Sequence, residues 1–359
     1  MSTYYLLIDG AKLVKQGDVL KLKKDGDVYN TVFPHKAEQI FILGNVEITT
    51  PAFKFLMKHR IDTVFLSKNG KFYGKLSFTP SKNVFLRIKQ YKLLEDEEFG
   101  LNFAKTIVRS KIKNQIVFLQ RVARRNNKSV KLIKTINRIQ NLLPELEKAT
   151  TIESVRGYEG MASKLYFGVF GYSLVPEFAK FEGRSKNPPL DNVNAVLSFL
   201  YTLIYFRVDG LLESEGIDSY AGFLHSLDYG RKSLSFDLME EYRTPIAETL
   251  AVSLFNLGIL NEGDFREVDY QGGEDEFIYD ELTEQVPEVD ILEKPKAVLL
   301  TRNGLKKVIN HFERKLQTKI YYPISERRET FKKLMHLQIS RFKQIVNGET
   351  ATYHPLQIR

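Results

Sequence analysis

The first eighty residues contain short apolar-rich runs separated by turn residues, which is typical of β-strands, and some of these runs alternate apolar and polar side chains. The clearest runs cover residues 4–8, 19–23, 28–33 and 39–43, with Asp-Gly pairs in some of the turns between them. Residues 61–67 and 72–76 flank a Lys-Asn-Gly turn, and its Asn-Gly pair predicts a hairpin. Between these runs, Pro51 predicts a short helix over residues 52–59 with Thr50 as its N-cap.

From residue 84 onward the apolar positions recur every three or four residues, which is typical of helices that pack on one face. Residues 103–122 show this spacing, with basic residues between the apolar ones. Residues 197–204 are strongly apolar, so we expect a core helix there, capped by Asp191. The sequence therefore predicts an α+β fold. A small N-terminal β-rich domain over residues 1–80 precedes a larger all-helical domain over residues 81–359.

The length of 359 residues is enough for about two domains. Cysteine is absent, which excludes disulfides, thiol catalysis and cysteine-ligated metal sites. The chain contains no run of about 18 or more apolar residues, and its N-terminus has the pattern of a first strand. We therefore expect no membrane span and no signal peptide, and the absence of cysteine fits a cytoplasmic protein.

The charge of the chain is unevenly distributed. The formal net charge is +9, yet residues 274–293 hold nine acidic residues and no basic one, so the remainder carries nine more positive charges, +18. Such an excess indicates a polyanionic partner, most often nucleic acid, although charge that serves only solubility gives the same pattern. We expect residues 270–293 to form an acidic loop insertion outside the core.

Residues 222–243, GFLHSLDYGRKSLSFDLMEEYR, concentrate the side chains best suited to chemistry. His225 closes a short apolar run, and a helix that begins near residue 235 places Asp237 one turn from Glu240 and Glu241. Neighbouring carboxylates repel each other unless water or a cation relieves them, and a histidine would complete a mixed nitrogen and oxygen ligand set. The alternative is a solvated acidic face beside a structural histidine.

Several segments resemble the CRISPR-associated protein 1 family, the integrases that insert spacers into CRISPR arrays. GFLH followed by SFDLMEEYR is similar to the family's C-terminal signature, and GYEGMASKLYF to its glutamate-containing motif. RSKNPPLDNVNAVLSFLYTLIY, SKIKNQIVFLQR and LLTRNGLKKVINHFERKLQTKI resemble further helices of the family, and residues 41–76 resemble its β-domain. The acidic stretch has no counterpart, and family members vary at the position of Glu240.

The resemblance implies a metal site made of Glu159, His225 and Asp237, with Glu240 as an outer ligand or as a residue that orients His225. These four are the expected catalytic residues, and Mg²⁺ or Mn²⁺ is the expected cofactor. The resemblance also implies a homodimer formed through the β-rich domain, double-stranded DNA (spacer and CRISPR repeat) as substrate, and CRISPR-associated protein 2 as partner. The candidate DNA contacts are basic residues near the motifs, namely Lys164, Arg184, Arg231, Lys232 and Arg243.

The leading hypothesis is a divalent-metal-dependent DNA integrase and endonuclease, which joins spacer 3′-hydroxyls to the CRISPR repeat by transesterification. The first alternative is a non-catalytic nucleic-acid scaffold whose acidic cluster is structural. The second is a zinc hydrolase that acts on small molecules, since two carboxylates and a histidine also suit zinc. Glu241 is assigned to the solvent side, so Glu241→Gln is expected to be nearly silent.

Overall fold

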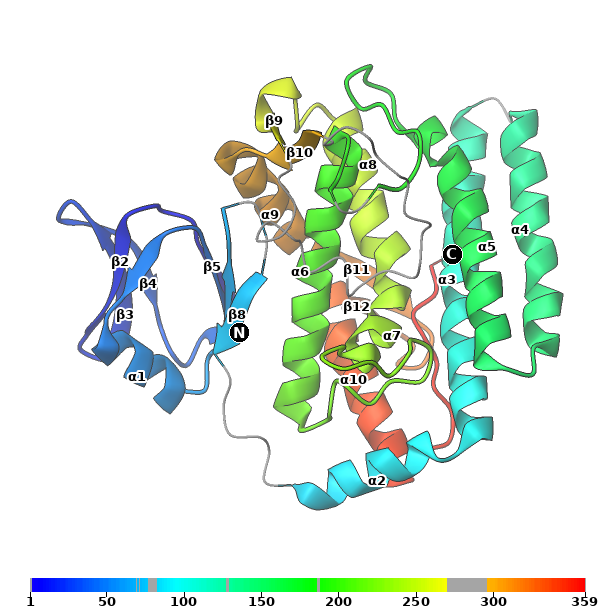
Figure 1. The fold of residues 1–359 in the computed structure, drawn as a ribbon, viewed down its shortest axis with the longest axis horizontal. Coiled ribbons are helices and arrows are strands. Elements are labelled where there is room, and N and C mark those ends of the chain that lie inside the picture. Colours follow the sequence, from blue (N-terminus) through cyan, green and yellow to red (C-terminus); the bar gives the residue numbers. More distant parts are fainter. Residues whose placement is uncertain are drawn as a thin grey trace. The chain divides into compact units, whose positions relative to one another are not determined.

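The computed structural model describes residues 2–68, 70, 72–76, 83–126, 129–185, 188–269 and 296–358. Their contacts divide these residues into two compact units, one within Met1–Pro80 and one that follows it in the chain. Figure 1 shows the strands of the first unit in blue and the second unit in cyan to red. The predicted acidic insertion, residues 270–293, lies outside the described residues.

Two four-stranded sheets and one helix make up the described part of the first unit (Figure 1). One sheet has the order β1 (Ser2–Leu6), β5 (Ala37–Leu43), β7 (Asp62–Leu66), β8 (Phe72–Leu76), and the other has the order β4 (Asp27–Val32), β3 (Val19–Lys24), β2 (Ala11–Gln16), β6 (Val46–Ile48). Strands β7 and β8 pair antiparallel, as the predicted hairpin requires. Apolar side chains of both sheets share one core with Phe55 and Leu56 of α1 (Thr50–Lys58). The N-cap of α1 is Thr49 and not Thr50, because the Thr49 side chain accepts the hydrogen bond from the N–H of Ala52.

Helices make up most of the second unit. They are α2 (Val84–Leu94), α3 (Glu97–Arg125), α4 (Val130–Lys148), α5 (Ile152–Phe170), α6 (Asn192–Glu215), α7 (Ser233–Tyr242), α8 (Thr249–Asn256), α9 (Arg302–Leu316) and α10 (Phe331–Asn347). A π-helix, Arg243–Glu248, joins α7 to α8 without a break. Two small antiparallel sheets pair β9 (Phe265–Asp269) with β10 (Lys296–Leu300) and β11 (Lys319–Tyr322) with β12 (Arg327–Thr330). The β-rich and helical order is confirmed, but the second part is mostly helical and not all-helical, since its chain reverses direction through these short strand pairs.

Helix α6 is a core element of the second unit. Its predicted cap is confirmed, because Asp191 Oδ1 accepts from the N–H of Asn194 at 2.7 Å. Within the described ranges it is the one helix whose length and composition would suit a membrane span, yet 94% of its apolar window is buried inside the fold. Its apolar surface is therefore used for packing.

Helices α3, α5 and α7 position the candidate site, and α3 packs against both of the others. The buried face of α3 carries four polar residues among its apolar ones, Ser110, Lys111, Asn114 and Gln115. Polar groups at core positions are costly unless they have partners. The partners of the first three lie on α5, on α7 and on the chain that follows α10.

Candidate functional site

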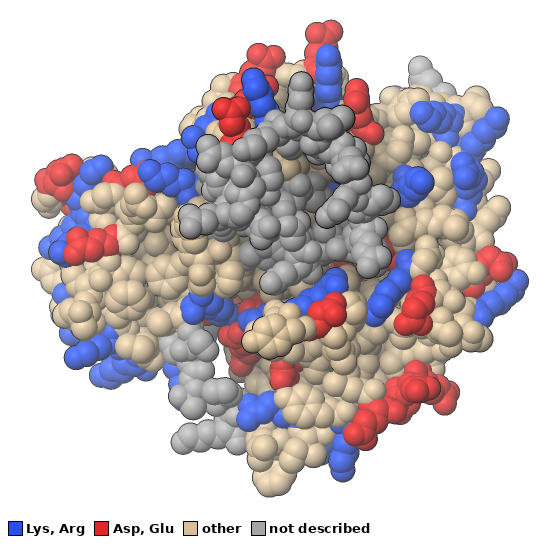
Figure 2. Space-filling model, viewed as in Figure 1, with Lys and Arg blue, Asp and Glu red and all other residues tan. Residues whose placement is uncertain are grey.

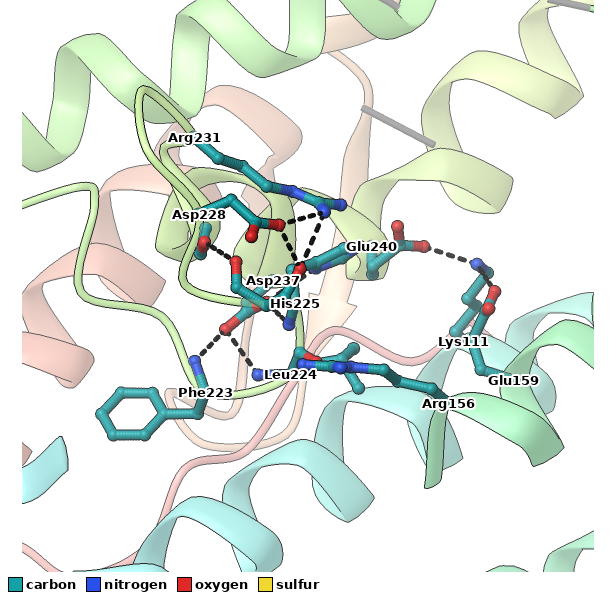
Figure 3. A network of polar contacts seen from close by, with 12 residues as sticks. Lys111, Arg156, Glu159, Phe223, Leu224, His225, Asp228, Arg231, Asp237 and Glu240 are labelled. Atoms are coloured by element: carbon teal, nitrogen blue, oxygen red, sulfur yellow. Dashed lines mark hydrogen bonds and ion pairs between the residues drawn. The ribbon is translucent and has the colours of Figure 1, made fainter. Parts of the chain in front are cut away.

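Asp237, in α7, is wholly buried and fixes the loop that carries the histidine (Figure 3). Its Oδ2 accepts hydrogen bonds from the backbone N–H groups of Phe223 (2.6 Å) and Leu224 (3.0 Å). Its Oδ1 accepts from the backbone N–H of His225 at 2.9 Å. Gly222 permits this approach, since a Cβ at that position would lie 2.5 Å from the backbone at the start of α7. Three consecutive amides therefore hold the loop on one carboxylate.

The same carboxylate orients the imidazole of His225, whose Nδ1 lies 2.7 Å from Asp237 Oδ1. Because an ionised carboxylate only accepts hydrogen bonds, Nδ1 carries the proton of this contact, and in the neutral imidazole the lone pair then lies on Nε2. This is the arrangement typical of metal-binding histidines. Both oxygens of Asp237 already accept from nitrogen donors, so its geometry is that of a residue that orients the histidine.

Glu159 on α5 and Glu240 on α7 meet at one lysine (Figure 3). Lys111, from α3, contacts Glu159 Oε1 through its Nζ, and the same Nζ lies 2.7 Å from Glu240 Oε2. None of the three side chains is more than 6% exposed. Two buried carboxylates without a cation would repel each other and lose hydration, so the ammonium stabilises both.

Two arginines make further contacts with the histidine loop and with Glu240. Arg156 lies one turn before Glu159 on α5 and donates from Nε to the carbonyl of Leu224 at 2.5 Å. Helix α5 therefore holds the histidine loop as well as supplying a carboxylate. Arg243 Nη2 lies 2.9 Å from Glu240 Oε1, so the two oxygens of that glutamate face two different cations.

Glu248, the last residue of the π-helix, is a buried carboxylate close to these groups. It accepts hydrogen bonds from the hydroxyls of Tyr166 (2.6 Å) and Tyr201 (2.8 Å). Burial, reinforced by the charge of Glu248, raises the pKa of both tyrosines well above the ordinary value. The guanidinium of Arg243 lies over the Tyr201 ring, 4.9 Å from its centroid. This network ties α5 and α6 to the segment that follows α7.

The assignment of Glu241 to the solvent side is wrong, because this residue is completely buried. Its carboxylate accepts from the Tyr353 hydroxyl (2.7 Å), the Leu356 N–H (2.5 Å) and Gln338 Nε2 (2.9 Å). Burial raises the pKa of Glu241 above its ordinary value, while these hydrogen bonds act in the opposite direction. Successive helical residues point about 100° apart, so Glu240 and Glu241 face different neighbours.

The donor set suits a hard divalent ion in its chemistry. Glu159 and Glu240 already converge on one cation, and His225 offers the Nε2 lone pair. As the side chains lie, no three carboxylate or imidazole groups in the described part of the chain converge closely enough to hold an ion. The ammonium of Lys111 lies between the two glutamates, so both can bind one metal ion only after that ammonium moves.

The candidate DNA contacts divide into one exposed lysine and four half-buried residues. Lys164 is exposed on α5. The other four are paired within the fold, Arg184 with Asn194, Arg231 with Ser226, Lys232 with Asp209, and Arg243 with Glu240. Figure 2 shows lysines and arginines interspersed with acidic residues over one face. Local sequence around a basic residue does not reveal whether its charge is directed inward.

Lys111 and Arg156 belong to the site but are not among the residues predicted for it. Lys111 belongs to a helix whose other basic residues fall between apolar positions. Its spacing in the helix indicates that it is buried. Lys111 lies four residues after Ile107 and four before Gln115, so it shares a helix face with these two wholly buried residues. A charged residue at a core position indicates an internal partner. Arg156 gives no comparable signal, because its partner is a backbone carbonyl.

Comparison with known proteins agrees with this architecture. The family model of the CRISPR associated protein Cas1 matches residues 4–273. A CRISPR-associated endonuclease Cas1 of Thermus thermophilus is 32% identical over 359 residues, which cover 99% of this chain and 97% of that protein. A casposase bound to its integration product has the same fold, with a TM-score of 0.79, 20% identity, and coverage of 98% of this chain and 92% of the other. A chain of a Cas6-RT-Cas1–Cas2 complex gives a TM-score of 0.79 at 24% identity and covers 98% of this chain, which spans 35% of that longer one. The chain belongs to the Cas1 family of CRISPR-associated proteins.

Proposed function

We propose that this protein is a divalent-metal-dependent DNA integrase and endonuclease of CRISPR spacer acquisition. The observation that carries this proposal is the convergence of Glu159 and Glu240, from two helices, on one buried cation. The nearby His225 is held by Asp237 with its Nε2 lone pair available. The endonuclease name of the Thermus thermophilus relative and the integration product of the casposase agree with this chemistry.

The residues have distinct roles in this proposal. In place of the expected ligands Glu159, His225 and Asp237, the proposed ligands are Glu159, Glu240 and His225 Nε2. Both oxygens of Asp237 already face nitrogen donors, so Asp237 keeps the imidazole in the required orientation. Mg²⁺ or Mn²⁺ at this position would supply charge stabilisation for the attacking and leaving oxygens. A DNA 3′-hydroxyl attacks a phosphodiester of the repeat, a new phosphorus–oxygen bond forms, and the previous 3′-oxygen leaves. The protein positions the two DNA strands for this exchange.

The same proposal includes the partners and the location. Double-stranded spacer DNA and the CRISPR repeat are the substrates, and a homodimer joined by CRISPR-associated protein 2 is the acting assembly. The complex named for Cas1 and Cas2 among the structural relatives supports that partner. Activity in the cytoplasm of a prokaryote follows from a DNA substrate of this kind.

The test is strand transfer of a labelled DNA end into a repeat-containing plasmid, with and without CRISPR-associated protein 2, in Mg²⁺, Mn²⁺, Zn²⁺ or chelator. We expect transfer and nicking in Mg²⁺ or Mn²⁺ and their loss in Glu159→Gln, His225→Ala and Glu240→Gln. Glu153→Gln is the matched control, because Glu153 is an exposed carboxylate on the same helix as Glu159. DNA affinity should be similar in all four variants.

The two alternatives give different results in this assay. A non-catalytic scaffold binds the plasmid and shows no turnover with any ion. A zinc hydrolase leaves DNA unchanged and depends on Zn²⁺. Either pattern in the wild-type protein would overturn the proposed function.

A further inference from the structure

Lys111 occupies an unusual position for a lysine. It lies near the middle of the 29-residue helix α3 and is 5% exposed. Its Nζ is shared by Glu159 of α5 and Glu240 of α7, so one positive charge joins three helices (Figure 3). Lysines are almost never buried to this degree unless they are paired.

The chemistry of this contact resembles that of a metal site. An ammonium is a compact point charge with several donors, unlike the planar guanidinium of arginine. Like a metal ion, it can therefore contact several carboxylate oxygens from one small position. Glu159 Oε1 also accepts from the Ser163 hydroxyl at 2.8 Å, and Glu240 Oε1 is paired with Arg243. Lys111 therefore contacts one oxygen of each glutamate, in the place between the two carboxylates where a shared cation would lie.

We propose that Lys111 is a built-in cation that holds Glu159 and Glu240 together in the metal-free protein and competes with the divalent ion for them. This inference rests on the proposed function, because it concerns the same two carboxylates. Without metal, the ammonium removes the repulsion between them and keeps the site folded. When a divalent ion binds, the ammonium gives up its place, and this exchange makes binding weaker than the same donors alone would allow.

The decisive variant is Lys111→Met, which keeps the side-chain length and removes the charge. We expect its affinity for Mn²⁺, measured by titration calorimetry and by electron paramagnetic resonance of the free ion, to rise at least about tenfold. We also expect a lower melting temperature than wild type in chelator, and a larger upward shift on addition of Mn²⁺. An affinity equal to or weaker than that of wild type, in a folded variant, would overturn the competition.

Two further variants complete the design. Lys113→Met removes an exposed lysine from the same helix and should change neither Mn²⁺ affinity nor metal-free stability. Lys111→Arg retains a positive charge between the carboxylates, so it should fold without metal and bind Mn²⁺ no more tightly than wild type. If Lys111→Met does not fold in chelator, recovery of its fold by Mn²⁺ supports the exchange. Failure to fold at any Mn²⁺ concentration, together with tight Mn²⁺ binding by Lys111→Arg, contradicts it.

Failure of this inference can be separated from failure of the proposed function. If wild type binds no divalent ion and Glu159→Gln leaves that result unchanged, the metal site itself is refuted. The comparison of melting temperatures in chelator then still decides whether Lys111 stabilises the two glutamates. If wild type binds Mn²⁺ and Lys111→Met binds it equally well, the metal site stands and the competition does not.

Discussion

Three acidic residues of α7 perform three different tasks. Asp237 holds the histidine loop, Glu240 faces Lys111 and Arg243, and Glu241 faces the chain that follows α10. Their spacing places them within two turns, but helical rotation directs each side chain to a different neighbour. A single acidic run therefore combines a candidate ligand, an orienting residue and a structural anchor.

Asp237→Asn should lose strand transfer and also lose stability, by about 1–3 kcal/mol. The amide that replaces one carboxylate oxygen would direct N–H groups at the donors of residues 223–225, leaving buried polar groups unpaired. His225→Ala should abolish transfer with a smaller loss of stability, because the amides would keep their acceptor. Urea unfolding of both variants provides the measurement, and an unchanged free energy of unfolding in Asp237→Asn would contradict this role.

Glu241→Gln should lower the free energy of unfolding by about 1–3 kcal/mol, and not be silent. The carboxylate accepts from Tyr353, Leu356 and Gln338, whereas an amide would present a donor to at least one of them. Denaturant unfolding with Glu153→Gln as the exposed control tests this expectation. Equal stability of the two variants would mean that the network is dispensable.

At the scale of elements, α3 is the structural centre of the site. Its Ser110 and Asn114 bond the carbonyl of Leu356, at 2.8 and 2.9 Å, on either side of Lys111. Glu241 of α7 holds the same strip of chain through the N–H of Leu356. Residues 353–358 therefore fasten together the two helices that supply Lys111 and Glu240.

The contact between α9 and α10 should make stability depend on pH. Lys315 of α9 lies over the Phe331 ring of α10, and burial, with a smaller contribution from Arg121, lowers its pKa from 10.5 to about 8. Between these values the unfolded chain binds more protons than the folded one, so the free energy of unfolding rises as pH increases. We expect a gain of about 1 kcal/mol from pH 7.5 to 9.5, since partial exposure screens the charge.

Lys315→Met should remove this gain, and Lys306→Met, an exposed change on the same helix, should retain it. Urea unfolding of the three proteins at both pH values is the measurement. A parallel pH response in wild type and Lys315→Met would show that Lys315 does not cause it.

At the scale of the whole molecule, charge governs the expected encounter with DNA. Lysine and arginine total 53 against 44 acidic residues, and the excess is larger outside residues 274–293. Phosphate contacts should therefore dominate affinity. Binding to duplex DNA should weaken steeply with salt, with a log–log slope of about 0.9 for each neutralised phosphate.

Two lysines make this expectation specific. If the exposed charge of Lys164 contacts a phosphate, Lys164→Gln should reduce the log–log salt slope by the contribution of about one phosphate contact. Lys232→Gln should instead lower stability, because Lys232 pairs with the buried Asp209. Fluorescence anisotropy at several salt concentrations, with urea unfolding alongside, distinguishes the two effects. A flat salt response of the wild-type protein would refute phosphate-dominated binding.

The sequence alone determined the order and type of the main elements. The Asn-Gly pair predicted the β7–β8 hairpin, helical spacing predicted α3 and α6, and the position of Asp191 predicted the cap of α6. Family membership also followed from short motifs, which the match over residues 4–273 confirms. These features depend on the backbone preferences of individual residues and on the spacing of apolar residues that are close together in the chain. The sequence contains both.

Only the tertiary structure decided which charges meet. Lys111 and Glu159 are 48 residues apart, and Glu241 and Leu356 are 115 apart, so no local pattern pairs them. The small sheets within the helical unit and the inward direction of four basic side chains are likewise outcomes of packing. The physical reason is that a buried charge takes whichever partner the packed helices bring within hydrogen-bond distance, and that choice is made among elements distant in the chain.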